Sequence, residues 1–280
     1  MLKNIETFIG CGHNYSEADI VLFGAPYDGT TSNRPGARFA GKAIRAESFG
    51  IETYSPYQDK DLSDIKVYDG GELDLSFGDP GPVLDKIYRY VKAVTNDMKI
   101  PVMMGGEHLV TLGAFKAVCE KHPDVCIIHF DAHSDLRDEY IGQTLSHACV
   151  LRRCHELIGD NRIFQFGVRS GDREEFIWGK KHVYTENFTM DTLSEIVKKL
   201  EKNPVYFTID LDVLDSGVFP ATGTPEAGGI SFKELIAAIE KISKLNIVGA
   251  DICELSPPYD SSGASTALAC KVVRELMLSL

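Results

Sequence analysis

Residues 125–135 read Val-Cys-Ile-Ile-His-Phe-Asp-Ala-His-Ser-Asp, an apolar run that passes directly into a cluster of acidic and imidazole side chains. The run has the length and composition of a buried β-strand. Asp131, His133 and Asp135 follow at two-residue spacing, which would place them on one face of an extended chain. Ligands of open α/β sheets bind beyond the carboxyl ends of the strands, so this stretch predicts a strand that leads into a functional site.

Two further apolar runs end in the same way. Residues 100–104, Ile-Pro-Val-Met-Met, precede Gly-Gly-Glu-His at 105–108, and residues 205–209, Val-Tyr-Phe-Thr-Ile, precede Asp-Leu-Asp at 210–212. Three strand ends of this kind are expected to face one crevice of the sheet. The predicted site therefore combines two imidazoles with four carboxylates: His108, Asp131, His133, Asp135, Asp210 and Asp212.

This set of side chains predicts a site for two divalent cations. Four neighbouring carboxylates repel one another unless protons or cations balance them, and two divalent ions would cancel four negative charges. Carboxylates and imidazoles without cysteine favour manganese before zinc. Asp-x-Asp alone is also typical of turns and helix caps, so the prediction depends on the three groups together. His129 lies inside the apolar run, where a hydrogen-bonded core histidine is favoured over a ligand.

Apolar runs alternate with amphipathic segments along the whole chain. This alternation predicts an α/β fold, a single three-layer α/β/α domain over residues 1–280 with a mainly parallel sheet. Besides the three runs above, strands are expected at 20–25, 163–168, 182–184 and 247–253. Helices are expected at 82–95, 109–120, 190–202, 232–245 and 266–277.

Composition narrows the function classes. A net charge of −12 disfavours nucleic acids and anionic membrane surfaces, and mildly favours a cationic substrate. The seven cysteines form no Cys-x-x-Cys pair, so a reducing cytoplasmic setting is expected, with Cys126, Cys253 and Cys270 in the core. No signal-peptide pattern and no run of eighteen apolar residues is present, so neither secretion nor membrane spanning is expected.

The acidic and histidine-containing sequences at the three strand ends resemble the metal motifs of the ureohydrolase family, which contains arginases and agmatinases. The matching segments are Gly-Gly-Glu-His at 105–108, Phe-Asp-Ala-His-Ser-Asp at 130–135 and Thr-Ile-Asp-Leu-Asp-Val-Leu-Asp at 208–215. The resemblance extends from Gly-Ala-Pro-Tyr-Asp-Gly-Thr at 24–30 to Asp-Ile-Cys-Glu-Leu-Ser-Pro at 251–257, and it is strongest toward agmatinases. It implies an arginase-like fold.

The resemblance also implies a cofactor, two Mn²⁺ ions per chain. Asp131 and Asp210 would bridge both ions. His108 and Asp135 would complete the protein ligands of one ion, and His133 and Asp212 those of the other. A metal-bridging hydroxide would attack the guanidinium carbon, which is a poor electrophile and needs an oriented nucleophile.

Three residues acquire catalytic roles through the same resemblance. Glu254 would hold the substrate guanidinium through charge-assisted hydrogen bonds. His147 would shuttle protons, and Asp135 would pass the proton of the hydroxide to the leaving amine. The family further implies a homo-oligomer, a trimer or hexamer, although no stretch of the sequence identifies a contact surface.

Substrate choice is expected to depend on residues 137–148. Arginases carry Ser-Gly-Asn just before the histidine that corresponds to His147, whereas this chain has Gly-Gln-Thr-Leu-Ser at 142–146. Asp138 and Glu139 could attract a substrate whose end away from the guanidinium group is cationic. The Glu of Gly-Gly-Glu-His is typical of agmatinases. Hydrolysis of agmatine to putrescine and urea is therefore predicted, with guanidinobutyrate, guanidinopropionate, arginine and formiminoglutamate as alternatives.

Three positions depart from the family pattern, and two other function classes stay open. Ser216, Ala148 and Lys42 stand where proline, glycine and proline are common, which affects loop shape more than metal binding. A non-catalytic, metal-stabilised binding protein would not need Glu254 and His147 beside an open metal position. A deacetylase-like amidohydrolase would use one zinc ion, which His108 and the second aspartate of each cluster disfavour.

Overall fold

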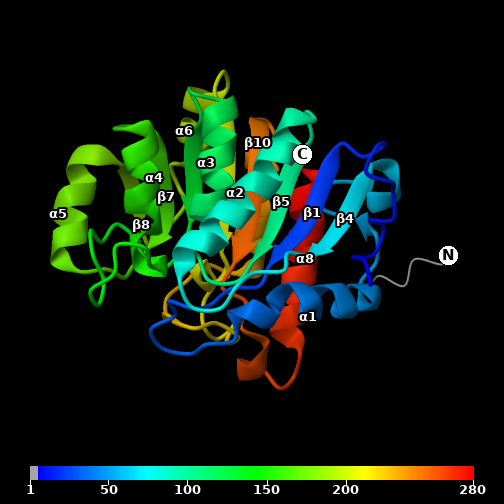
Figure 1. Cartoon of the computed structure of the whole chain (residues 1–280), viewed down its shortest axis with the longest axis horizontal. Coiled ribbons are helices and arrows are strands. Elements are labelled where there is room, and N and C mark those ends of the chain that lie inside the picture. Colours follow the sequence, from blue (N-terminus) through cyan, green and yellow to red (C-terminus); the bar gives the residue numbers. More distant parts are fainter. Residues whose placement is uncertain (1–5) are drawn as a thin grey trace.

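An eight-stranded parallel sheet forms the centre of the chain, whose computed structural model describes residues 6–280 (Figure 1). The strand order is β4-β1-β5-β10-β9-β6-β7-β8, and every neighbouring pair is parallel. The strands are β1 Ile20–Ala25, β4 Val67–Glu72, β5 Ile100–Gly105, β6 Cys126–Phe130, β7 Ile163–Val168, β8 Tyr184–Asn187, β9 Pro204–Asp210 and β10 Asn246–Cys253. Residues 1–5 of the predicted 1–280 unit lie outside the described residues.

Helices cover both faces of the sheet, which confirms the predicted three-layer α/β/α fold. One apolar core lies under α2 Pro80–Asn96, α3 Val110–Lys121 and α4 Val150–Ile158, which stand in front of the sheet in Figure 1. The core on the other face lies under α1 Ala40–Glu47, α6 Leu193–Leu200, α7 Phe232–Ile242 and α8 Ala264–Leu278. Helix α5, Arg173–His182, packs beside β8.

Short elements complete the chain. Strands β2 Tyr54–Ser55 and β3 Lys60–Asp61 form a small antiparallel pair. The 3₁₀ turns are η1 Ala37–Phe39, η2 Ser48–Gly50, η3 Leu62–Asp64, η4 His147–Cys149, η5 Leu211–Val213 and η6 Pro257–Tyr259. Two of these turns, η4 and η5, carry residues of the predicted site.

The strands expected from apolar runs are present, with one correction. Residues 163–168 form β7 as expected, but the strand expected at 182–184 starts only at Tyr184. His182 instead ends α5, because a capping box between Asp172 and Glu175 starts that helix and a basic last turn complements its dipole. The sequence reasoning also did not anticipate β4, α1, α4 and α5.

The order of the strands in the sheet brings together the strand ends that carry the predicted site residues. Strands β5, β10, β9 and β6 are consecutive neighbours at the centre of the sheet, although residues 108 and 254 lie far apart in sequence. The loops after these strands gather at the lower edge of the sheet in Figure 1. Cys126, Cys253 and Cys270 are buried as expected, and all seven cysteines are free. Within residues 6–280, no helix is both long and apolar enough to cross a membrane.

Candidate metal centre

The six residues predicted from the three strand ends converge on one buried point. The Nδ1 atom of His108 lies 3.1 Å from Oδ2 of Asp131, 3.1 Å from Oδ2 of Asp135 and 3.5 Å from Oδ2 of Asp210. The Nδ1 atom of His133 lies 3.0 Å from Oδ2 of Asp212 and 3.5 Å from Oδ1 of Asp131. Asp131 therefore faces both imidazoles and occupies the middle of the cluster.

Turns, rather than extended strands, bring these side chains together. The expectation that Asp131, His133 and Asp135 share one face of a strand was wrong, because β6 ends at Phe130. In a strand, side chains two residues apart would be separated by about 6.6 Å, twice the rise per residue. Here the His133 N–H donates to Oδ1 of Asp131 at 2.5 Å, and Asp135 adopts a φ of +52°. The tight turn directs the three side chains inward.

Asp210 and Asp212 use a similar turn. The Asp212 N–H donates to Oδ1 of Asp210 at 2.8 Å, where β9 passes into η5. The Ala132 N–H donates to Oδ1 of Asp212 at 3.1 Å, which connects this turn to the loop after β6. A short aspartate side chain that accepts from a backbone N–H two residues later stabilises such turns. The two loops are thus fixed to each other as well as to the sheet.

The ring of His108 is oriented by a buried chain of hydrogen bonds. The Thr208 hydroxyl donates to Oδ1 of Asp251 at 2.6 Å, and its oxygen lies 2.9 Å from Nε2 of His108. Because the hydroxyl proton is directed to Asp251, Thr208 accepts from the Nε2–H of His108. The Nδ1 atom of His108 has no hydrogen-bond partner among the described residues and lies against carboxylate oxygens. Burial opposes protonation of this imidazole, but Asp131 and Asp135 outweigh it and raise the pKa of His108 well above its ordinary value. A metal ion can replace the proton at this nitrogen.

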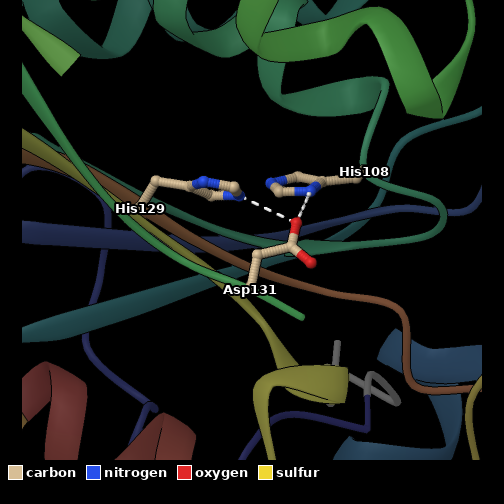
Figure 2. A group of neighbouring side chains, drawn as sticks. All are labelled: His108, His129 and Asp131. Atoms are coloured by element: carbon tan, nitrogen blue, oxygen red, sulfur yellow. Dashed lines mark hydrogen bonds and ion pairs between the residues drawn. The ribbon is translucent and has the colours of Figure 1, made fainter. Parts of the chain in front are cut away.

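His129 lies beside the cluster but has no free lone pair (Figure 2). Its Nε2 lies 2.8 Å from Oδ2 of Asp131, the same oxygen that His108 approaches from the other side. The side-chain amide of Gln165 donates to Nδ1 of His129 at 3.0 Å, and the Thr185 hydroxyl fixes the orientation of that amide by donating to its oxygen at 3.0 Å. His129 therefore donates to Asp131 and holds this carboxylate in place.

The electrostatics of the cluster favour bound cations. Burial and the neighbouring Asp131 raise the pKa of Asp135 to about 7. Burial, with Asp212 and Asp131, also raises the pKa of Asp210 well above its ordinary value. Burial opposes protonation of His133, but Asp212 and Asp131 outweigh it and raise its pKa to about 12. Without cations, the cluster must take up protons to offset its own negative charge, and divalent ions can replace those protons.

A cavity of about 250 Å³ opens beside the cluster and contains the other predicted catalytic residues. Glu254, at a φ of +66° after β10, accepts from the His108 N–H at 2.8 Å, and burial raises its pKa well above the ordinary value. His147 in η4 has its Nε2 3.4 Å from the Ser32 hydroxyl, and burial lowers its pKa to about 4. The imidazole of His147 is therefore neutral near pH 7.

The residues of segment 137–148 that line the cavity differ from those expected. Asp138 pairs with Arg153 at 2.6 Å and is 74% exposed, and neither Asp138 nor Glu139 lines the cavity. Arg137 and Tyr140 line it instead. The guanidinium of Arg137 lies 4.6 Å from the centre of the Tyr140 ring, and its Nε lies 3.2 Å from Oε2 of Glu175. These residues belong to the segment 137–148, where substrate contacts were expected.

Glu107 connects the site to the loop after β1, a role that the sequence reasoning did not identify. Its carboxylate accepts from the Thr30 N–H at 2.9 Å, the Thr30 hydroxyl at 2.6 Å and the Thr31 hydroxyl at 3.0 Å. The Thr30 hydroxyl oxygen in turn accepts from the His147 N–H at 3.1 Å.

The adjacent Gly106 packs so closely that a Cβ there would lie 1.8 Å from the Tyr27 carbonyl oxygen. Backbone contact requires glycine at this position.

Comparison with known proteins identifies the family of this chain. The chain matches the Arginase family over residues 18–279. It is 46% identical over 277 residues to the agmatinase of Bacillus subtilis (strain 168), covering 98% of this chain and 96% of that protein. The mitochondrial guanidino acid hydrolase of Homo sapiens is 32% identical over 275 residues, with 94% and 78% of the two chains covered. The crystal structure of agmatine ureohydrolase of Thermoplasma volcanium matches with a TM-score of 0.89 at 35% identity, covering 98% of this chain and 94% of that one. This chain belongs to the arginase family and is a metal-dependent ureohydrolase.

Proposed function

We propose that this enzyme hydrolyses agmatine to putrescine and urea at a binuclear manganese centre. The observation that carries the proposal is the position of His108 Nδ1, which lies 3.1 Å from an oxygen of Asp131 and 3.1 Å from an oxygen of Asp135 without a hydrogen-bond partner among the described residues. When bound, two ions would supply an activated water as the nucleophile. The proposed ligands are all six clustered side chains: His108, Asp131, His133, Asp135, Asp210 and Asp212.

Asp131 and Asp210 are proposed to serve both ions. Asp131 supports this role because one of its oxygens lies near His108 and the other near His133. Asp210 approaches His108 through Oδ2, while its Oδ1 accepts from the Asp212 N–H. His108 with Asp135, and His133 with Asp212, then form the two separate pairs of ligands.

Glu254 is proposed to hold the substrate guanidinium. Its carboxylate lines the cavity, where burial and the nearby Glu107 raise its pKa and make its ionised form unfavourable. A guanidinium cation favours the ionised form and matches a carboxylate through paired N–H donors. Substrate binding therefore offsets the cost of the buried charge, and it orients the guanidinium carbon toward the ions.

His147 and Asp135 are proposed to handle protons. The amine leaves only after it gains a proton, so the site needs an acid at the end of the reaction and a base at its start. His147 lines the cavity as a neutral imidazole whose Nδ1 has no partner among the described residues. Asp135 is held against His108 in the same cavity and is proposed to take the proton of the nucleophile and pass it to the amine.

The charge around the cavity supports a diamine product. Arg137, which lines the cavity, is already paired with Glu175, so it presents little free positive charge to a substrate. A second candidate substrate class, the guanidino acids, also depends on Arg137. If Arg137 released Glu175, its guanidinium would suit the carboxylate of a guanidino acid such as guanidinobutyrate, the class named for the human relative.

A urea-release assay on manganese-loaded enzyme tests the proposal. Agmatine should be cleaved with a higher kcat/KM than guanidinobutyrate, guanidinopropionate or arginine. It should also be cleaved with a higher kcat/KM than formiminoglutamate, whose formimino group yields formamide and whose cleavage is followed through that product. Metal analysis should find about two ions per chain. Arg137→Gln should leave agmatine turnover within a few-fold of wild type. Faster cleavage of guanidinobutyrate that is lost in Arg137→Gln would reject agmatine and support the guanidino acid. Two bound ions with neither urea nor formamide released from any of these compounds would contradict the proposal.

We also propose a cytoplasmic setting and a homo-oligomer, a trimer or hexamer. The free state of all seven cysteines supports a reducing compartment. Sedimentation of the manganese-loaded protein tests the oligomer, and a monomer at micromolar concentration would contradict it.

A further inference from the structure

A second cluster of imidazole and carboxylate groups lies at the opposite edge of the sheet from the metal centre. His155 stands in the last turn of α4, Asp160 in the connection to β7, and His182 at the end of α5. The three lie where β7 begins, whereas the metal centre lies where the parallel strands end. Helices α4 and α5, which carry His155 and His182, lie on the left side of the molecule in Figure 1. The cluster is therefore separate from the proposed catalytic residues.

The two imidazoles meet on one carboxylate oxygen. The Nε2 atom of His155 lies 2.8 Å from Oδ1 of Asp160, and the Nδ1 atom of His182 lies 2.7 Å from the same oxygen. One ligand atom from each residue lies within 4.8 Å of the others. An ion bonded at about 2.1 Å to two ligands at a tetrahedral angle separates them by about 3.4 Å. The two contacts between the imidazoles and Asp160 would have to widen by roughly 0.6–0.7 Å to reach that separation.

We propose that His155, Asp160 and His182 bind a divalent transition-metal ion of the Zn²⁺, Ni²⁺ and Cu²⁺ class. Two imidazole nitrogens and one carboxylate oxygen are borderline ligands that suit these ions better than Mg²⁺ or Ca²⁺. The Asp160 side chain is 52% exposed and that of His182 is 30% exposed. An ion can therefore reach the cluster from solvent, and water can complete its coordination.

Local charge both favours and limits binding. His155 and His182 stand in the last turns of their helices, where the negative end of the helix dipole attracts cations. Lys180 and Lys181 lie in the same turn as His182, and the guanidinium of Arg152 lies 3.9 Å from the centre of the Trp178 ring. These cations oppose a metal ion. We therefore expect weaker binding than at a closed four-ligand zinc site.

Trp178 provides a reporter for this cluster alone. It is the single tryptophan of the chain. Its ring is stacked on His182, with centroids 4.3 Å apart and planes at 22°. It meets His155 edge-on, with centroids 4.7 Å apart. A paramagnetic ion bound to these imidazoles would lie within a few ångströms of the indole and quench its fluorescence.

The test is a Ni²⁺ titration of tag-free protein that has first been saturated with Mn²⁺. Trp178 fluorescence should fall in a saturable manner with one ion per chain, and diamagnetic Zn²⁺ should restore it by competition. His155→Gln and His182→Gln should each raise the Ni²⁺ midpoint at least about tenfold. At metal sites, loss of a residue that only hydrogen-bonds a ligand already weakens binding by about that factor, so loss of a ligand itself should cost no less. His13→Gln is the matched control, because His13 lies beside β4 at the other end of the strand order.

A second measurement separates metal binding from a purely structural cluster. Zn²⁺ should raise the Tm of wild type and of His13→Gln, and it should not raise the Tm of His182→Gln. Asp160→Asn keeps both imidazoles and decides the question if a histidine variant folds poorly, because it should also weaken Ni²⁺ quenching. Equal midpoints in wild type and Asp160→Asn would overturn the proposal. So would the absence of both quenching by Ni²⁺ and a Tm increase with Zn²⁺.

Discussion

Replacing Thr208 by valine tests whether the hydrogen bonds behind His108 determine metal affinity. Valine has nearly the shape of threonine, so the packing within β9 is retained while the hydroxyl is lost. The change removes the acceptor of the His108 Nε2–H and the donor to Oδ1 of Asp251. All three residues are buried, so water cannot easily replace the missing partner.

The expected magnitudes follow from these two broken contacts. Each buried polar group left without a partner costs about 1–3 kcal/mol, so the free energy of unfolding should fall by roughly 2–6 kcal/mol. The lower half of that range is expected, because Asp251 keeps the hydrogen bond from the Tyr206 hydroxyl. The His108 ring also loses the contact that directs its lone pair. Loss of such a partner weakens metal binding about 10–100-fold, or about 1.4–2.7 kcal/mol.

Urea formation measured against Mn²⁺ concentration gives the result directly. Thr208→Val should shift the Mn²⁺ midpoint upward by that factor, while Thr208→Ser, which keeps the hydroxyl, should stay close to wild type. Thr222→Val is the matched control, because the buried Thr222 hydroxyl has no hydrogen-bond partner among the described residues. If Thr208→Val lowered stability but left the Mn²⁺ midpoint unchanged, the orienting role of this chain of hydrogen bonds would be refuted.

Three further predictions concern the cluster and the cavity. Asp210→Asn should abolish urea formation yet leave the metal-free Tm unchanged or higher, because it removes a carboxylate that Asp212 and Asp131 repel; retained activity would contradict the bridging role. Mn²⁺ must displace the proton of His133, whose pKa is about 12, at every pH from 5 to 8, and below pH 7 it must also displace the proton of Asp135, whose pKa is about 7. The fall of affinity toward low pH, measured by calorimetry across pH 5–8, should therefore become steeper below pH 7 by up to about tenfold per pH unit, and a slope that does not change near pH 7 would exclude the Asp135 proton. Glu254→Gln should lower kcat/KM for agmatine about 10–150-fold, since a charge-assisted hydrogen bond contributes about 1.5–3 kcal/mol. Steady-state kinetics at saturating Mn²⁺ measures this loss, and a loss below that range would contradict the proposed contact.

Much of the fold could be predicted because buried parallel strands leave a strong pattern. Strands such as β6, β7 and β9 are buried along their whole length and are nearly continuous apolar runs. Strand β4 reads Val-Tyr-Asp-Gly-Gly-Glu and lacks that pattern, because it lies at the sheet edge and its Asp69 pairs with Arg45. Strand order could not be derived either, since it depends on contacts between segments distant in sequence.

The candidate site could be predicted in its membership but not in its geometry. Residue types and strand ends were enough to select the six clustered side chains. The tight turn at Asp135, with its positive φ, could not be derived from spacing. Two-residue periodicity selected residues that do cluster, but they lie in a turn and not on one face of a strand. The Arg137 contacts with Glu175 and Tyr140 also depend on tertiary structure that no local pattern encodes.

The signal that sequence reasoning left unused is a row of polar residues inside apolar strands. Asp251, Thr208, His129, Gln165 and Thr185 are successive register partners across β10, β9, β6, β7 and β8. Register partners on neighbouring strands project to the same face, so these side chains form a continuous line beneath the metal centre. A buried polar side chain is costly unless it is hydrogen-bonded, and each member has a partner in the row or in the residues above it. Two members orient His108 and Asp131 directly, and the others fix those two. The row therefore extends the site into the sheet, and substitutions along it should change metal affinity even where they lie far from substrate.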